Sequence, residues 1–450
     1  MRRLPLTGIL FAVLLPAATP VTTQGVTFNK DVLPIVQKNC QSCHRPGEIG
    51  PFSLLSYNEA RPWAKAIKAA VLSRKMPPWF ADPNYGHFAN DMRLGEADIK
   101  TLVAWVDGGA LEGNAKDAPA PLHFQDGWNI KPDLVISMPK AFEIQAKGTI
   151  NYKYIRVKGN FTQDMWVTAA EMRAGARKNV HHGKVWVLPP GSHWMEHAEY
   201  GVPYEHETQA EVIGRNSPAD GNDILGKFNP GLGWQSFDIG GSAKFIPKGS
   251  DLVFEMHYTA NGEPTSDVSD VGIVFAKEAP ETRYYFATAP SASNLVIPPG
   301  DSNAEVVSEV TVNADNVRLA YVQPHMHLRG KDYELRLAYP SGEAETVFKG
   351  KWDFNWQQGF TFLKPILMPK GTRIIGISHF DNSINNPYNP DPAKEIHWGD
   401  QNWDEMSNAF LGLLMPRSTP QESLLRRSGP SLLPRVPGVA GPTLAALAKN

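Results

Sequence analysis

An internal repeat constrains the fold of this chain more than any other feature. The segments IPKGSDLVFEMHYT (246–259) and MPKGTRIIGISHFD (368–381) align over fourteen residues without a gap. Each has a PKG turn, a run with the alternation of a β-strand, and then a histidine followed by an aromatic residue. A histidine pair precedes each copy, as HH in one case and as HMH in the other. Because a repeat of this kind marks two copies of one structural unit, we expect two similar β domains in tandem.

Short alternating runs fill the rest of this region, and PPG, PKG and PSG turns separate them. Outside the repeat they include DLVISM, INYKYIRV, MWVTAAEM, KVWVL and YELRLAY, and the chain has 38 Gly and 38 Pro residues for the turns. This pattern is typical of an all-β sandwich or jelly roll. We predict an N-terminal sandwich at 125–285 and a C-terminal sandwich at 286–415.

The chain before the sandwiches has a helical pattern instead. Segments 28–39, 57–75 and 96–109 have apolar residues at helical spacing, and the last segment ends in Gly-Gly. A run rich in Pro and Ala, 116–124, reads as a linker. We therefore predict a multidomain chain, in which a small all-α domain at 25–115 is followed by two tandem all-β jelly-roll sandwiches.

The only two cysteines of the chain, Cys40 and Cys43, lie in the run CQSCH of the helical domain. C-x-x-C-H is the attachment signal of c-type haem, in which both thiols bind the vinyl groups and the following histidine, here His44, ligates the iron. A redox-active or structural CxxC is the alternative, and the histidine in the fifth position argues against it. Three helices around one covalently bound haem c resemble a small cytochrome c domain.

A second haem ligand is expected on an irregular segment. Met76 stands in RKMPPWF, where Pro77 and Pro78 force the chain out of a helix directly after it. A thioether ligand raises the reduction potential, as suits an electron carrier. Met92 and His87 are the alternatives, and we predict Met76.

The first residues, 1–24, have a basic start and then a short apolar run that ends in small residues. This is typical of a secretory signal peptide, and the run is too short to span a membrane as a stable helix. We therefore expect a periplasmic or secreted protein without a membrane span. A formal net charge of -2 gives no electrostatic reason to expect a nucleic-acid partner. The segment 416–450, rich in Pro, Ser, Leu and Arg, is predicted to be a flexible tail.

The first group of candidate metal ligands lies in the N-terminal sandwich. His257 alternates away from the larger apolar residues of its run and is available to join His181 and His182. Neighbouring side chains of a regular strand diverge, so the HH pair needs a bulge or a strand end to converge on one ion. Independent core or surface histidines are the alternative.

The second group lies in the C-terminal sandwich. His325 and His327 share one face of a predicted strand, and Met406 follows in the run DEM. A thioether among imidazoles selects a soft ion such as Cu(I), whereas zinc prefers a carboxylate or a thiolate. The repeat leaves a rival third ligand open, because His379 is the positional twin of His257 and would complete a three-histidine site.

The order of these motifs, HH, EMHY, HMH and DEM, resembles the copper type II ascorbate-dependent monooxygenases, the family of peptidylglycine α-hydroxylating monooxygenase and dopamine β-monooxygenase. The resemblance covers about 150–412. It implies two copper ions on two β-sandwiches, one for electron transfer and one for oxygen activation. The electron-transfer copper falls to His181, His182 and His257, and the catalytic copper to His325, His327 and Met406.

The chain also departs from the pattern of this family. Animal members contain disulfides, whereas both cysteines here belong to the CQSCH motif. Peptidylglycine members bind the substrate carboxylate with an Arg two residues before HxH and a Tyr four residues after the ligand Met, where this chain has Gln323 and Phe410. Without that cation and that hydroxyl we expect no carboxylate clamp, and peptide amidation is disfavoured.

These patterns predict an exported copper-dependent monooxygenase that hydroxylates a C–H bond of a small-molecule substrate with O₂. Its electrons would come from an ascorbate-like reductant or another cytochrome, and the fused haem c would relay them. The alternative is a non-catalytic copper and haem protein that transfers electrons or handles copper.

Overall fold

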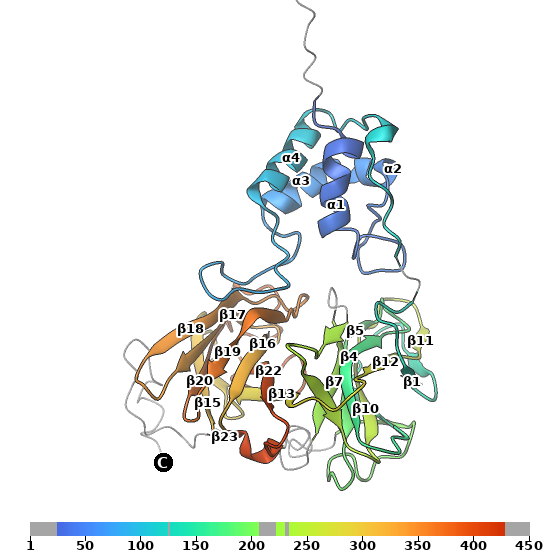
Figure 1. Cartoon of the computed structure of the whole chain (residues 1–450). Helices are drawn as coiled ribbons and strands as arrows, with labels where there is room; N and C mark the ends of the chain where they lie inside the picture. Colours follow the sequence, from blue (N-terminus) through green and yellow to red (C-terminus); the bar gives the residue numbers. More distant parts are fainter. Residues whose placement is uncertain (1–24, 125–126, 207–221, 230–233, 428–450) are drawn as a thin grey trace, which may run out of the picture.

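The computed structural model describes residues 25–124, 127–206, 222–229 and 234–427. The protein is mostly β, with several sheets in jelly-roll-like sandwiches and a few short helices near the N-terminus. The helical part lies above two β units, which stand side by side (Figure 1). The predicted signal peptide, 1–24, lies outside the described residues. None of the helices described is long and apolar enough to cross a membrane.

The helical part has its helices where the sequence predicts them. Its core contains Phe28, Leu102 and Trp105, which are almost fully buried. Ser56 caps α2, because its side chain accepts the backbone N–H of Glu59. The helical elements are η1 (Phe28–Val32), α1 (Leu33–Asn39), α2 (Tyr57–Ala60), η2 (Arg61–Trp63), α3 (Ala64–Leu72), α4 (Glu96–Asp107) and η3 (Ala115–Asp117).

Each β unit contains a five-stranded antiparallel sheet with one copy of the repeat at its centre. The strand order is β6-β3-β10-β5-β7 in the first unit and β18-β17-β20-β15-β23 in the second. The central strands are β10 (Asp251–Tyr258) and β20 (Arg373–Phe380). The others are β3 (Lys153–Val157), β5 (Val180–Leu188), β6 (Pro203–Tyr204), β7 (Asp223–Phe228), β15 (Ala304–Val312), β17 (Gly330–Ala338), β18 (Ala344–Lys351) and β23 (Leu425–Arg427).

A nine-stranded sheet runs through both units and joins them. Its order is β1-β12-β4-β9-β13-β22-β16-β19, and β8 pairs with β4. The joint is β13, which pairs in parallel with β9 and antiparallel with β22. The strands are β1 (Leu134–Ser137), β4 (Met165–Arg173), β8 (Gln235–Ser236), β9 (Ala243–Ile246), β12 (Asp270–Phe275), β13 (Thr282–Ser291), β16 (Val317–His325), β19 (Phe360–Met368) and β22 (Asn408–Pro416). Two-stranded sheets are formed by β2 (Phe142–Ile144) with β11 (Thr265–Asp267) and by β14 (Val296–Ile297) with β21 (Ile396–His397).

The joint explains how the two units are held together. Along β13, Tyr284 and Phe286 belong to the core of the first unit, whereas Tyr285 and Ala287 belong to that of the second. Successive residues of a strand point to opposite faces, so a strand buried on both faces needs a continuous apolar run. Its neighbour β22, NAFLGLLMP, has this character. The predicted boundary between residues 285 and 286 lies inside β13, so backbone hydrogen bonds cross it.

One segment of the helical part crosses to the second β unit. We call residues 78–90 the strap. Ala81 and Phe88 form β-bridges to β18 and β19, respectively. Trp79 and Phe88 pack with the ring of Phe360, with centroids 4.9 and 5.4 Å away. The strap therefore anchors the helical part to the second unit through both backbone and aromatic contacts.

The start of the predicted flexible tail, 416–450, is ordered, and the prediction is wrong for this part. Strand β23 pairs with β15, and η5 (Gln421–Ser423) leads into it. Leu424 is fully buried in the core of the second unit. The composition of the whole tail gave no sign that Leu424 would be buried in this core. Residues 428–450 lie outside the described part.

Candidate metal centres

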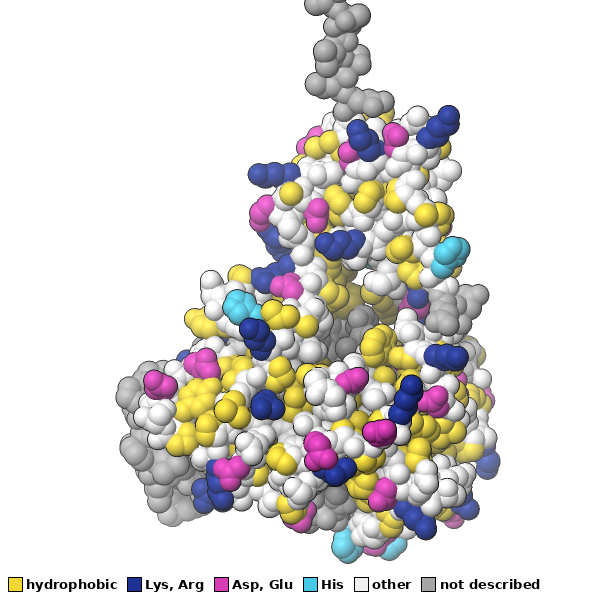
Figure 2. Space-filling view, viewed as in Figure 1, with side chains coloured by type: hydrophobic (Ala, Val, Ile, Leu, Met, Phe, Trp, Pro, Cys, Tyr) yellow, Lys and Arg dark blue, Asp and Glu magenta, His cyan; other side chains and the backbone are white. Residues whose placement is uncertain are grey.

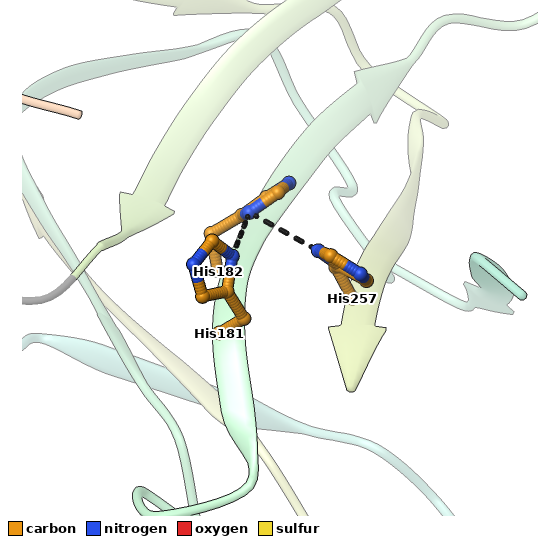
Figure 3. Close-up of side chains that lie close together, drawn as sticks. All are labelled: His181, His182 and His257. Atoms are coloured by element: carbon orange, nitrogen blue, oxygen red, sulfur yellow. Dashed lines mark hydrogen bonds between the residues drawn. The ribbon is translucent and has the colours of Figure 1, made fainter. Parts of the chain in front are cut away.

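Three histidines of the first β unit converge (Figure 3). His181 and His182 lie at the start of β5, and His257 lies near the end of the neighbouring β10. In the ladder, His257 pairs with His182 and the next residue of β10 pairs with Val180, so His181 is left unpaired. This is a β-bulge, which allows successive side chains to turn to one side. The sequence left a bulge or a strand end open as the way for the HH pair to converge, and the structure has the bulge.

The spacing of the ring nitrogens fits one metal ion. The Nδ1 atoms of His181 and His182 are 3.0 Å apart, and those of His182 and His257 are 3.4 Å apart. Two nitrogens that each lie ~2.0 Å from one ion in tetrahedral geometry are separated by roughly 3.3 Å. The potential ligand atoms of the three residues all lie within 4.8 Å of one another. This buried three-histidine group could hold a metal ion.

Burial keeps these imidazoles neutral. It lowers the pKa of His181 to about 4 and that of His257 to about 3. The pKa of His182 lies well below its usual value, because the ring is buried and two histidines surround it. A neutral imidazole keeps one lone pair, so at neutral pH the group presents nitrogen donors rather than cations.

Other residues orient the three rings. Nε2 of His182 lies 2.8 Å from the hydroxyl of Tyr152, which is placed to accept its N–H. The side-chain amide of Asn402, from the second unit, lies 3.2 Å from Nε2 of His257. Its amide oxygen is buried without a hydrogen-bond partner among the described residues, so turning the amide over would give the His257 N–H an acceptor. Phe354 stacks on the ring of His181 at 4.8 Å. Such partners fix the tautomers of ligating histidines.

Two further histidines meet in the second unit. The ring centroids of His325 and His327 are 5.2 Å apart, and both residues are buried. Nδ1 of His325 donates to Oε1 of Gln357 at 3.0 Å, and Nδ1 of His327 donates to the carbonyl of Asp404 at 3.2 Å. These bonds leave the Nε2 atoms as lone-pair donors. Nε2 of His327 is buried and has no hydrogen-bond partner in the described part of the chain.

Met406 lies in a segment, 405–408, that is hydrogen-bonded to the HMH motif and its flanking residues. The preceding residue, Glu405, accepts the backbone N–H groups of His327 and Arg329 at 2.8 and 2.6 Å. The residue two positions on, Asn408, pairs with His325 in the ladder between β16 and β22. Met406 is 2% exposed, and its sulfur accepts from the amide of Asn408 at 3.3 Å. The thioether is therefore buried between two residues that contact the histidine pair.

His379, the positional twin of His257, has different partners. Its Nδ1 lies 2.7 Å from a carboxylate oxygen of Asp332, and its Nε2 lies 3.5 Å from that of Glu305. Both partners belong to the strands beside β20, and the His379 side chain is 26% exposed. The repeat thus preserves the strand but not the role of its histidine.

Contacts of Asn402 with His257 and of Phe354 with His181 bring the second unit against the histidine group of the first. A positive charge on His325 would lower the pKa of His182, and one on His327 would lower that of His257. Asp400 raises the pKa of both His257 and His327, and it accepts the hydroxyl of Tyr154 at 2.9 Å. One carboxylate of the second unit thus acts on a histidine of each group.

A small cavity lies beside the aromatic residues that flank both groups. Its volume is about 250 Å³, and Trp352, Phe354 and Tyr388 are among its lining residues. Trp352 donates its indole N–H to the carbonyl of His327 at 3.0 Å, while Phe354 stacks on His181. The histidines themselves do not line this cavity, but two of its lining residues each contact a histidine of one group.

A lysine of the first unit contacts both positions, 323 and 410, at which this chain lacks the carboxylate clamp. Lys227 of β7 is buried and donates to Oε1 of Gln323 at 2.5 Å. Its ammonium lies 5.3 Å from the ring centroid of Phe410, and burial holds its pKa well below the usual value. The amide at position 323 is thus engaged within the protein.

The CQSCH motif follows α1 as a tight turn. The backbone N–H groups of Cys43 and His44 donate to the carbonyl of Cys40 at 3.1 and 2.9 Å, and Cys40 and Cys43 are not joined in a disulfide. Nδ1 of His44 donates to the carbonyl of Phe52 at 3.2 Å, which leaves Nε2 as the lone-pair donor. This is the tautomer that an iron-ligating histidine needs, so the residues present fit a c-type haem.

The candidates for the second haem ligand lie in different surroundings. Met76 lines a cavity of about 650 Å³, whereas Cys43 lines another of about 540 Å³. His87 belongs to the strap, and its carbonyl accepts the N–H of Leu363 at 2.7 Å. Met92 is 37% exposed. The pairing of His44 with Met76 stays a prediction.

Several residues of these sites were not singled out from the sequence: Tyr152, Asn402, Phe354, Gln357 and Asp400. Each reaches a histidine from a distant segment, so local patterns contain no sign of the contact. Asp400 and Asn402 had a usable signal, since they stand six and four residues before Met406 in the same polar run.

Comparison with known proteins does not identify a family. No family model and no curated protein matches the sequence. Among solved structures, the major capsid protein P2 of bacteriophage PM2 has 10% identity and a TM-score of 0.26, covering 60% of this chain and 98% of that one. PNGase F, a glycosylasparaginase from Flavobacterium meningosepticum, has 11% identity and a TM-score of 0.28, covering 64% and 100%. These TM-scores are too low to carry an argument about function.

Proposed function

We propose that this chain is an exported, periplasmic or secreted copper-dependent monooxygenase with a fused haem c domain. The observation that carries the proposal is the pair of buried histidine groups, one in each β unit, with Asn402 and Phe354 of the second unit in contact with the first group. One group has three imidazoles with converging Nδ1 atoms, and the other has two buried imidazoles together with Met406, whose buried sulfur contacts Asn408, the ladder partner of His325. This asymmetry suits two metal sites with different tasks.

The donor set supports copper over other metals. Imidazole alone would suit several ions, but a thioether with imidazoles favours the soft Cu(I). Three histidines alone, as in the first group, also suit zinc, so the preference for copper rests on the thioether of Met406 in the second group. Copper at these residues would supply one-electron chemistry in the first unit and oxygen activation in the second.

The chain's own residues would bind, orient and shield. Tyr152 and Asn402 hold the rings of the first group, while Oε1 of Gln357 accepts a hydrogen bond from Nδ1 of His325. Glu405 fixes the HMH segment through two backbone N–H groups. Phe354 covers one face of His181 and so excludes water from it. Preorganised ligands of this kind keep their geometry while the oxidation state changes.

The proposed substrate is a small organic molecule without a carboxylate anchor of the peptidylglycine type. The amide of Gln323 is engaged by Lys227, and position 410 is an aromatic ring without a hydroxyl. The cavity of about 250 Å³ beside Trp352 and Phe354 is the proposed approach for this molecule. Its aromatic walls favour an apolar or planar group.

Oxygen consumption tests this function. Protein loaded with copper and haem is mixed with ascorbate and a panel of small aromatic and aliphatic compounds, while O₂ uptake and product mass are followed. We expect at least one compound to gain a single oxygen atom in proportion to the O₂ consumed. O₂ uptake or electron flow without any oxygenated product across the panel would favour the non-catalytic copper and haem protein instead.

A further inference from the structure

We propose that Arg177 and Glu48 position the CQSCH loop over the first β unit, so that electrons from the helical domain enter at the three-histidine group. This inference rests on the proposed function, because it assumes haem at Cys40, Cys43 and His44 and copper at the histidines. It adds a docking contact and two positioning residues that no motif indicated, on the side of the histidine group to which the resemblance assigns electron transfer.

The CQSCH loop and the first β unit share a cavity. Its volume is about 540 Å³, and Figure 2 shows the molecule hollowed where the helical part meets the β units. One wall is formed by Cys43 and the loop that follows it, 45–53. Met172, Lys178 and other residues of the first unit form the opposite wall. The edge of a group attached to Cys43 would therefore face the first unit.

An ion pair closes this contact. The guanidinium of Arg177 donates to the carboxylate of Glu48 at 2.6 Å and to the carbonyl of Gly47 at 3.4 Å. Arg45 also contacts Glu48, at 3.0 Å. The side chains of Arg177 and Glu48 are only 24% and 22% exposed, so water screens them less than an open surface pair.

The ion pair leads directly into the ligand strand. Arg177 lies in the turn between β4 and β5, and His181 follows four residues later at the bulge. A shift of the CQSCH loop would therefore pull on the backbone segment that also positions the imidazole of His181. The contact can fix the distance between the two redox sites.

Buried sulfur atoms connect the cavity with the histidines. Met172 lines the cavity and is 2% exposed. A Cβ added at Gly183 would lie 2.4 Å from the terminal methyl of Met172 and 3.3 Å from the sulfur of Met256. Gly183 follows His182, and Met256 precedes His257 in the sequence. Close-packed atoms thus extend from the cavity wall to the backbone of two of the three histidines.

The strap offers the competing entry point. It starts just after Met76, and the carbonyl of Phe80 accepts the N–H of Lys351 at 3.1 Å. The next residue, Trp352, donates to the carbonyl of His327. The strap therefore connects the helical domain with the His325 and His327 pair, but it does not contain the residues that would hold the haem covalently. We therefore assign entry to the first group.

A charge-swap experiment tests the assignment. In copper-loaded protein without O₂ or substrate, haem is photoreduced, and its reoxidation by cupric ion is followed by absorbance. Each event oxidises one ferrous haem and reduces one cupric ion. We expect Arg177→Glu and Glu48→Arg each to slow reoxidation by roughly tenfold, as expected for residues coupled in one contact, and the double swap to restore most of the rate. Because Glu48 lines the cavity beside Cys43, the haem midpoint potential is measured for each variant, so that a change in driving force is distinguished from a change in docking.

Arg373→Glu is the matched control, because Arg373 and its partner Glu309 are similarly exposed but lie in the second unit. Its reoxidation rate should equal that of the unaltered protein. If the charge reversals impair folding, Arg177→Gln and Glu48→Gln replace them with the same expectation of slower transfer. Unchanged rates in the single variants, or a double swap as slow as either one, would overturn the docking inference. Absence of haem or copper from the unaltered protein would overturn the proposed function instead.

Discussion

Replacement of Met406 by leucine separates the roles of the second group most sharply. The side chain is 2% exposed, and leucine keeps its apolar character and nearly its volume. Volume-conserving swaps in a core usually cost less than about 1.5 kcal/mol. Asn408 would lose its contact with the sulfur but would keep the hydrogen bond from Ser291 at 2.5 Å. The variant should therefore fold, and its melting temperature should decrease only slightly.

The effect on copper should be much larger than the effect on folding. Loss of a supporting partner alone lowers metal affinity about 10-fold to 100-fold, and loss of a ligand should cost at least as much. At ~1.4 kcal/mol per tenfold, this is roughly 1.4 to 2.8 kcal/mol of Cu(I) binding at the second site. Competition with a chromophoric Cu(I) chelator measures it, and O₂-dependent product formation should fall with it. Copper at the three-histidine group should stay.

His379→Ala is the control for this variant. Its imidazole contacts Asp332 and Glu305 and is partly exposed, so its loss should cost no more than about 1 kcal/mol of stability. Both coppers should remain. The reasoning is refuted if His379→Ala removes the second copper while Met406→Leu keeps full affinity and turnover.

Three further outcomes follow from the geometry. The pKa of His257 is about 3 in the folded metal-free chain, so the unfolded chain binds more protons as the pH falls below 6.5, the usual pKa of histidine. Stability of the metal-free protein should therefore fall between pH 7 and pH 5, by up to roughly 2 kcal/mol for each such buried histidine, as urea unfolding will measure. Asn402→Leu should weaken copper at the first site by about tenfold, in the same chelator assay, because His257 loses its partner. Replacing Cys40 and Cys43 together by serine should abolish covalent haem on a denaturing gel but leave the bound copper unchanged.

The sequence predicted the local parts of the fold well. The repeat placed β10 and β20, and the alternating runs placed the other long strands, because period-two patterns report burial on one face. The HH pair of β5 required a bulge or a strand end, and the structure has a bulge at His181. These inferences depend on neighbours within about ten residues, where side-chain spacing and backbone geometry are directly linked.

The long-range parts could not be read from the sequence. The repeat predicts a domain boundary at 285/286, but β13 runs across this boundary because its two faces pack into two different cores. Asn402 reaches His257 from 145 residues away, and the strap joins a segment near residue 80 to β18 and β19. Such contacts depend on how sheets pack, which a single sequence does not record. The role of His379 differs from that of its twin for the same reason, since acidic side chains on adjacent strands hold it.

Metal and haem content per chain tests the central claim most directly. Protein exported in a host that attaches haem c is purified, incubated with copper and zinc together, and freed of loosely bound ions before elemental analysis. The proposal predicts two copper ions and one covalently bound haem iron per chain, with the copper signal of three nitrogen ligands at one site. Zinc in place of copper, or a single metal ion shared by all five histidines, would contradict it.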